Sequence, residues 1–126
     1  MDEREFVRTV AERTGLGREE AADLTRATLE TLAHRLSPGE ARDLVTELPE
    51  GLADAVRRGT TDRIERFGHT DSVQRVAQRT MLKEEEADRG VRTVLAVLRE
   101  AISEKEFTDL MSQLGTDFSQ AVESAG

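Results

Sequence analysis

Two histidines are the candidate metal ligands of this sequence. His34 follows Glu30 at the spacing of one helical turn, so an imidazole and a carboxylate would share one face of a helix. A ferritin-like iron site needs a Glu-x-x-His spacing on each of two helices, and neither half of the sequence supplies one. His69 precedes Thr70 and Asp71, where capping and exposure to solvent are the ordinary roles. We therefore predict no metal ligands and no bound cofactor.

Groups that could act as nucleophiles or bind phosphate lack the partners that such chemistry needs. The chain has no cysteine, which excludes thiolate catalysis and disulfide bonds. Ser37 and Ser103 are better explained as helix caps, because no elbow motif or triad pattern surrounds them. The segment 15–17, Gly-Leu-Gly, lacks the preceding strand and the rest of a nucleotide-binding fingerprint. A solvated surface accounts for the 26 acidic residues better than a paired-carboxylate hydrolase does, so we predict a protein that is not an enzyme.

Several charged residues recur 66 positions apart, and a structural role explains them better than catalysis. A catalytic centre is seldom required twice in one chain, whereas an ion pair that stabilises a fold is required in each copy. We predict that Arg26 lies near Asp43, and we expect Arg13 and Arg79 to contact the acidic first turn of the helix that follows each of them. The predicted pairs are Arg26 with Asp43, Arg92 with Asp109, Arg13 with Glu20, and Arg79 with Glu86.

The helices that would position these side chains follow from apolar spacing and from capping residues. Residues 3–14 form one amphipathic helix, and Gly15 suits the left-handed cap that ends it. A long helix covers 18–36, with two glutamates in its first turn, where the helix dipole favours negative charge. The segment 37–40, Ser-Pro-Gly-Glu, predicts a capping box at the start of a third helix, and a short fourth helix ends before residue 59.

The pattern of the first half returns in the second half at an offset of 66 residues. VxxVAxRTxL occurs at 7–16 and at 73–82, and Glu-Glu-Ala and Ser-x-x-Glu also occur in both halves. The two repeats, 3–58 and 71–124, would each form four helices, with a linker at 59–70 between them. We predict an all-α fold of about eight helices with approximate two-fold symmetry. Since each half is too small for a comfortable core of its own, we expect one compact body.

Two details of this arrangement carry specific predictions. Gly90 lies at the centre of the second long helix, where glycine costs about 1 kcal/mol relative to alanine. Either this position has drifted on an exposed side, or another helix crosses close to its backbone opposite Leu24. In the linker, Ile64 and Phe67 would anchor the chain to the body, and 62–66 could form a single helical turn.

With the VAxRTxL, Glu-Glu-Ala and Ser-x-x-Glu motifs present twice, the sequence resembles the bacterial domain-of-unknown-function family numbered 2267. The resemblance spans about residues 3–124. It implies an all-helical protein built from a duplicated unit, and it assigns no activity and no functional residues. Ser72 stands where an aromatic residue is usual, as Phe6 does in the first copy, which leaves the corresponding helix of the second copy with a different core contact.

The overall charge and hydropathy narrow the classes of partner. A formal net charge of -8 disfavours nucleic acid and anionic membrane surfaces, because both reward a concentrated positive face. No segment approaches eighteen consecutive apolar residues, and the first residues, MDEREF, do not resemble a signal peptide. We therefore expect a cytoplasmic protein without a membrane or nucleic-acid partner.

The sequence is compatible with three hypotheses for function. The leading one is a non-enzymatic protein that binds another protein, or itself, through a surface between the repeats, with contact residues Leu24, Phe67 and Val97. The alternative is a regulatory or stress protein that binds a small molecule or a metal in a pocket between the repeats. An enzyme is the third and least favoured hypothesis.

Overall fold

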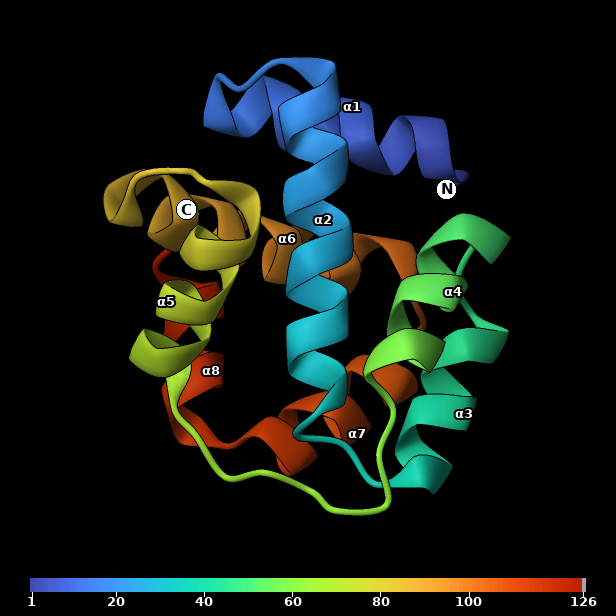
Figure 1. Cartoon of the computed structure of the whole chain (residues 1–126). Coiled ribbons are helices and arrows are strands. Elements are labelled where there is room, and N and C mark those ends of the chain that lie inside the picture. The colour runs from blue at the N-terminus through green and yellow to red at the C-terminus, as the bar shows by residue number, and fades with distance from the viewer. Residues whose placement is uncertain (126) are drawn as a thin grey trace.

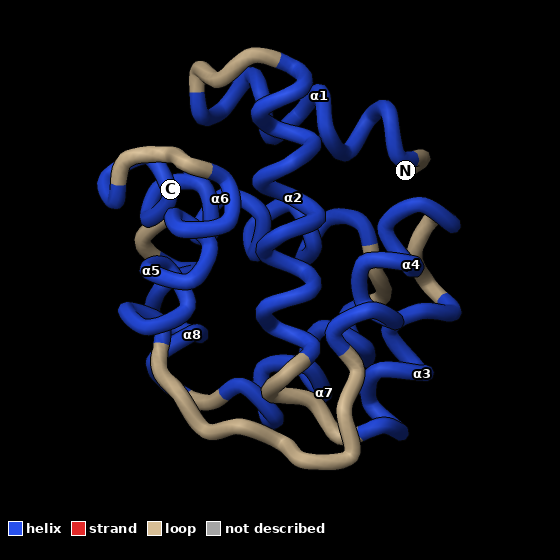
Figure 2. Tube along the Cα trace, in the orientation of Figure 1, coloured by secondary structure: helices blue, strands red, loops and turns tan. Residues whose placement is uncertain are grey.

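The structure is a computed structural model that describes residues 1–125. These residues contain eight helices and no strand. Their bounds are α1 Glu3–Thr14, α2 Arg18–Ala33, α3 Pro38–Thr46, α4 Glu50–Gly59, α5 His69–Thr80, α6 Glu84–Ala101, α7 Glu104–Leu114 and α8 Thr116–Glu123. The helices form one compact body, so the predicted all-α fold is confirmed. Figure 2 shows that the connections are short except for the one between α4 and α5.

Corresponding helices of the two halves begin at positions that differ by 66: α1 and α5, α2 and α6, α3 and α7, and α4 and α8. The left-handed cap predicted at Gly15 is present with φ 78°, and Met81, at the corresponding position of the second half, adopts φ 64°. These matches agree with the offset found in the sequence. The approximate two-fold symmetry itself stays a prediction.

The two long helices, α2 and α6, lie at the centre, and α6 passes behind α2 in the view of Figure 1. Each of the first helices of the halves, α1 and α5, contacts both long helices. The fourth helices flank them, α4 against α2 and α8 against α6, while α3 and α7 contact each other. The two halves are therefore joined at several helix contacts, and their buried apolar side chains form one continuous core.

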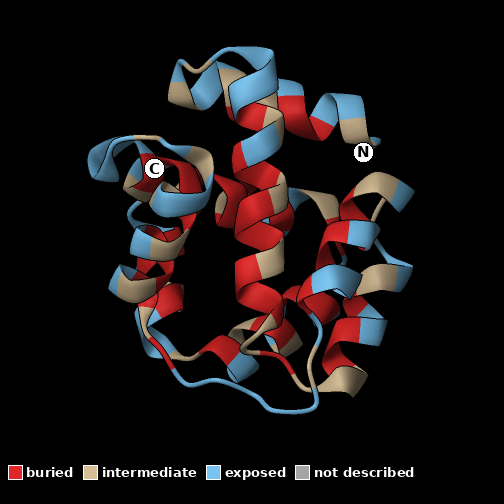
Figure 3. Cartoon of the chain, in the orientation of Figure 1, coloured by how far each residue is buried: buried red, intermediate tan, exposed pale blue. Residues whose placement is uncertain are grey.

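The crossing of α2 and α6 explains the glycine in the middle of α6. Gly90 is buried, and a Cβ atom at this position would lie 2.5 Å from Cδ2 of Leu24. A larger residue would force the Leu24 side chain to move, so of the two alternatives the close crossing opposite Leu24 is confirmed. Figure 3 shows the buried residues that run along α2.

The linker between α4 and α5 covers residues 60–68, which is shorter at both ends than predicted, and it contains no helical turn at 62–66. Phe67 is buried and anchors the linker as predicted, with the Arg75 guanidinium 3.9 Å from its ring centre. Arg35 donates hydrogen bonds to the carbonyls of Phe67 and Leu114. The anchoring role predicted for Ile64 is wrong, because its side chain is 46% exposed.

Candidate functional site

The residues predicted to form an interaction surface lie inside the molecule. Leu24 and Val97 have no exposed area, and Phe67 is 7% exposed. Leu24 lies on the buried side of α2 and Val97 on the buried side of α6. Phe67 packs against the Arg75 guanidinium. The predicted contact surface at these residues is wrong.

The repeated arginines form ion pairs, but their partners differ from the predicted ones. Arg26 pairs with Glu3 at 2.9 Å, and Arg92 pairs with Asp88 at 2.9 Å. The predicted partners Asp43 and Asp109 lie on α3 and α7 instead, where Asp109 pairs with Lys105 at 3.0 Å. Spacing within one repeat did not reveal that Arg26 reaches back to the start of α1.

Two further arginine pairs connect the halves. Arg13 on α1 pairs with Glu100 on α6 at 2.7 Å, and Arg79 on α5 pairs with Glu30 on α2 at 2.9 Å. The predicted partners, Glu20 and Glu86, instead accept hydrogen bonds from backbone N–H groups at the start of their own helices. The predicted pairs of Arg13 and Arg79 are therefore wrong, because each arginine reaches a helix of the opposite half.

The two histidines have structural roles in this fold. His34 is half-buried, and its Nδ1 lies 2.7 Å from the carbonyl oxygen of Gly59. His69 is 5% exposed, which contradicts the predicted exposure, and its Nε2 lies 2.9 Å from Oδ1 of Asp88. Its ring meets Phe118 edge to face. Neither histidine belongs to the group of side chains that, among the described residues, lie close enough together to hold a metal ion.

That group lies where α3 and α7 contact each other in opposite directions. Near the end of α7, Oε1 of Gln113 accepts a hydrogen bond of 2.9 Å from the backbone N–H of Ser37, which precedes α3. At the C-cap of α3, the Glu47 carboxylate accepts bonds of 2.7 and 2.9 Å from the N–H and hydroxyl of Ser103, which precedes α7. Each helix thus caps the N-terminus of the other.

This exchange of caps changes the role of the two glutamates in the predicted capping boxes. The serine side of each box is present, because Ser37 and Ser103 accept 3.1 Å bonds from the N–H of Glu40 and Glu106. The glutamate side is absent, since Gln113 and Glu47 already occupy the serine N–H groups. The side chains of Glu40 and Glu106 lie instead in the contact between the helices, where both are buried.

Glu40, Glu106 and Asp109 form what we call the carboxylate cluster. One carboxylate oxygen of each residue lies within 4.8 Å of the others. Glu40 is 9% exposed and Glu106 is 5% exposed, and the Oε2 atom of each is buried without a hydrogen-bond partner. Burial, a hydrogen bond with Glu40 and the nearby charges of Glu40, Asp43 and Glu47 raise the pKa of Glu106 to about 8.

The cluster therefore holds more negative charge than its surroundings compensate. Two buried carboxylates at this separation do not both stay ionised unless a proton or a cation neutralises them. The ammonium group of Lys105 contacts Asp109, and its side chain is 87% exposed. A set of carboxylate oxygens without sulfur or imidazole ligands favours hard cations such as Mg²⁺, Ca²⁺ and Mn²⁺.

The match to a known family covers all three residues of the cluster. The model of the family described as "Uncharacterized conserved protein (DUF2267)" matches residues 3–121. The chain belongs to this family. No curated protein matches the chain.

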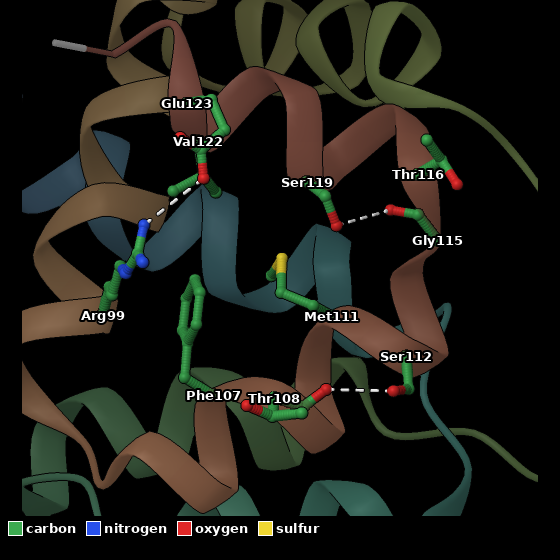
Figure 4. A pocket seen from close by; sticks show the side chains of 10 residues that line it. All are labelled: Arg99, Phe107, Thr108, Met111, Ser112, Gly115, Thr116, Ser119, Val122 and Glu123. Atoms are coloured by element: carbon green, nitrogen blue, oxygen red, sulfur yellow. Dashed lines mark hydrogen bonds and ion pairs between the residues drawn. The ribbon is translucent and has the colours of Figure 1, made fainter.

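A surface groove lies between α7 and α8 and is also lined by Arg99 of α6 (Figure 4). It has a volume of 480 Å³, and Phe107 and Met111 point into it. Several of its polar groups are already bonded: Ser112 and Ser119 donate to the carbonyls of Thr108 and Gly115, and Arg99 pairs with Glu123 at 3.5 Å. The groove therefore lacks the unpaired buried oxygens that distinguish the carboxylate cluster.

Sequence reasoning missed the cluster, although a signal was present. Glu40 lies four residues before Leu44, and Glu106 lies four residues before Leu110, so both glutamates share the buried face of their helix. A capping glutamate normally points away from that face. None of the helices in residues 1–125 combines the length and the apolar composition that a membrane span requires.

Proposed function

We propose that this protein is a non-enzymatic helical protein that binds a divalent cation between its two halves, through Glu40, Glu106 and Asp109. The observation that carries the proposal is the pair of buried Oε2 atoms without hydrogen-bond partners. It favours the metal-binding alternative over a protein-interaction surface at Leu24 and Val97, because those two residues are fully buried.

The surroundings of the cluster indicate the class of cation. All of its ligand atoms are carboxylate oxygens, which suit Mg²⁺, Ca²⁺ or Mn²⁺ better than the softer transition metals. The Asp109 side chain is 41% exposed, so water has access to one side of the site and can complete the coordination shell. Glu40 and Glu106 would supply the charge from the buried side.

The position of the cluster indicates what a bound cation would do. Glu40 belongs to the first half and Glu106 to the second, and their helices are joined by the exchanged caps. A cation there would remove the repulsion between the carboxylates and would hold α3 against α7. We therefore propose that the cation regulates how firmly the two halves are joined, as expected of a regulatory or structural protein.

Thermal unfolding tests this proposal. The protein is stripped with EDTA and then unfolded with 1 mM Mg²⁺, Ca²⁺ or Mn²⁺, and the fitting ion should raise the melting temperature by about 4 °C or more, because it binds the folded state. The variant Glu40→Gln/Glu106→Gln should lose this rise. The matched control is Glu20→Gln/Glu86→Gln, which removes the same charge from the same position of α2 and α6 and should keep it.

Two outcomes would contradict the proposal. In one, none of the three ions raises the melting temperature of the unmodified protein. In the other, both double variants keep the rise, which would show that the ion binds somewhere else on the acidic surface.

A further inference from the structure

The carboxylate cluster takes Glu106 and Asp109 from the second half of the chain and Glu40 from the first. On the basis of the proposed function, we propose that Asp43 is a fourth carboxylate ligand of the bound cation and that its participation selects Ca²⁺ over Mg²⁺. Each half would then supply one glutamate and one aspartate to the same ion.

The spacing of the acidic residues is the same on both helices of the site. Asp43 follows Glu40 by three positions, as Asp109 follows Glu106. Residues three positions apart share one face of a helix, so each aspartate lies next to its glutamate on α3 or α7. At this spacing, an oxygen of Asp109 lies within 4.8 Å of oxygens of both glutamates. An aspartate at the matching position of α3 has the same reach.

The contact between α3 and α7 uses matching positions on both helices. Gln113 of α7 accepts a bond from the N–H at the N-cap of α3, and Glu47, which precedes Gln113 by 66 positions, accepts one from the N–H at the N-cap of α7. Because the caps are exchanged at both ends, the side of the contact that carries Asp109 has a counterpart that carries Asp43. The glutamate pair thus lies between two aspartates.

The charge of Asp43 already acts on the cluster. Burial raises the pKa of Glu106 most, Glu40 raises it further, and the charge of Asp43 adds to the rise. The bond to Asp109 raises the pKa of Lys105 most, and the charges of Glu106 and Asp43 add to it. These effects agree with the placement of Asp43 beside the two glutamates.

Asp43 differs from Asp109 in having no partner to give up. Asp109 pairs with Lys105 at 3.0 Å, whereas the position that corresponds to Lys105 in the first half is Gly39. Asp43 is exposed, and within residues 1–125 its carboxylate makes no ion pair or hydrogen bond. Its side chain can therefore turn toward a cation without breaking a bond or leaving a packed position.

A fourth carboxylate changes which cation the site favours. The buried Oε2 atoms of Glu40 and Glu106, which lack partners, supply two oxygens from the inner side. Ca²⁺ takes about six to eight oxygens in a flexible arrangement, whereas Mg²⁺ requires a strict octahedron and is usually held by about one or two carboxylates and several waters. Carboxylates from four residues therefore suit Ca²⁺, and Asp43 contributes little to a Mg²⁺ shell.

Calorimetric titration of the full-length, metal-free protein with CaCl₂ and with MgCl₂ tests the role of Asp43. The unmodified protein should bind Ca²⁺ at least about tenfold more tightly than Mg²⁺. Asp43→Ala should weaken Ca²⁺ binding about tenfold or more and Mg²⁺ binding less than about threefold. Asp23→Ala is the matched control, because Asp23 is also an exposed aspartate at the sixth position of its helix but lies on α2, outside the cluster. It should change neither affinity.

The comparison of two ions separates a ligand from a nearby charge. Loss of a through-space charge weakens both divalent ions by the same factor, so equal weakening in Asp43→Ala, or none, would overturn the assignment of Asp43 and leave the cation site standing. Unmodified protein that prefers Mg²⁺ would also overturn it. If no divalent ion binds the unmodified protein, the proposed function fails as well. The melting temperature of metal-free Asp43→Ala, expected to be unchanged, shows that the variant is folded.

Discussion

The glutamates at the third helical position of α2, α3, α6 and α7 divide into two pairs with different environments. Glu20 and Glu86, on α2 and α6, accept bonds of 3.1 and 3.0 Å from the N–H of the residue that precedes each helix. Glu40 and Glu106, on α3 and α7, make no such bond and are buried. The glutamate has the same helical position in all four, but at α3 and α7 a side chain of the neighbouring helix accepts the bond from the N-cap N–H.

The comparison shows that a glutamate caps its own helix only where no side chain of another helix accepts a bond from the same N–H group. The N-termini of α2 and α6 are exposed, and the glutamates of these helices accept the bonds from the N-cap N–H groups. At α3 and α7 the side chains of Gln113 and Glu47 arrive from the opposite helix and take the same N–H groups. Once displaced, a carboxylate on a buried face requires a proton or a cation. The candidate site is thus a product of the contact between the halves.

The largest expected effect distinguishes the buried pair from the capping pair by pH. The pKa of Glu106 in the folded protein is raised from 4.5 to about 8, so its contribution to stability is complete below about pH 4.5 and is lost as the pH rises to about 8. In EDTA, we expect a loss on the order of 4 kcal/mol across this range. Urea unfolding of the unmodified protein and of Glu106→Gln measures it as a difference.

That difference isolates Glu106 from the other titrating groups, because all of them are present in both proteins. Glu106→Gln keeps the size of the side chain and removes the titration, so its stability should fall less between pH 4.5 and 8. Parallel curves for the two proteins would show that the carboxyl group of Glu106 contributes no pH-dependent stability in this range.

The helices themselves were predictable because their signals are local. Gly15 marks the end of α1, and the segment 37–40 marks the start of α3, within a few residues of the elements that they punctuate. Gly90 also revealed its partner, since a glycine in a long helix requires a close neighbour and the repeat places Leu24 at the matching position. The caps depend on one segment of sequence, and the contact of Gly90 with Leu24 was found through the repeat.

The ion pairs and the carboxylate cluster depend on helices that are distant in sequence. Arg79 meets Glu30 only because α5 of the second half lies on α2 of the first. Spacing along one helix cannot supply that contact. Likewise, the sequence predicts that Glu40 caps the N–H of Ser37, but in the folded protein Gln113 of α7 accepts the bond from this group. The sequence indicates such residues only through a polar side chain on an otherwise apolar face.

A smaller effect should separate the two serine caps of the exchanged contact. The hydroxyl of Ser103 accepts from the Glu106 N–H and donates to Glu47, whereas the hydroxyl of Ser37 caps Glu40 alone. Ser103→Ala should therefore cost about 2 kcal/mol and Ser37→Ala about 1 kcal/mol in the free energy of unfolding, measured by urea denaturation at pH 7. Equal costs would mean that the bond to Glu47 contributes nothing.

The smallest effect concerns the capping glutamates that remain exposed. Glu86→Gln keeps an oxygen that can accept the Lys83 N–H and loses only a charge near the N-terminus of α6. We expect a loss of about 0.5 kcal/mol, reduced further in 0.5 M salt because exposed charges are screened, and independent of pH between 6 and 9. A pH-dependent change comparable to that of Glu106→Gln would mean that an exposed capping glutamate and a displaced, buried one behave alike. The explanation based on competition between helices would then fail, because it attributes the difference between the two pairs to burial by the opposite helix.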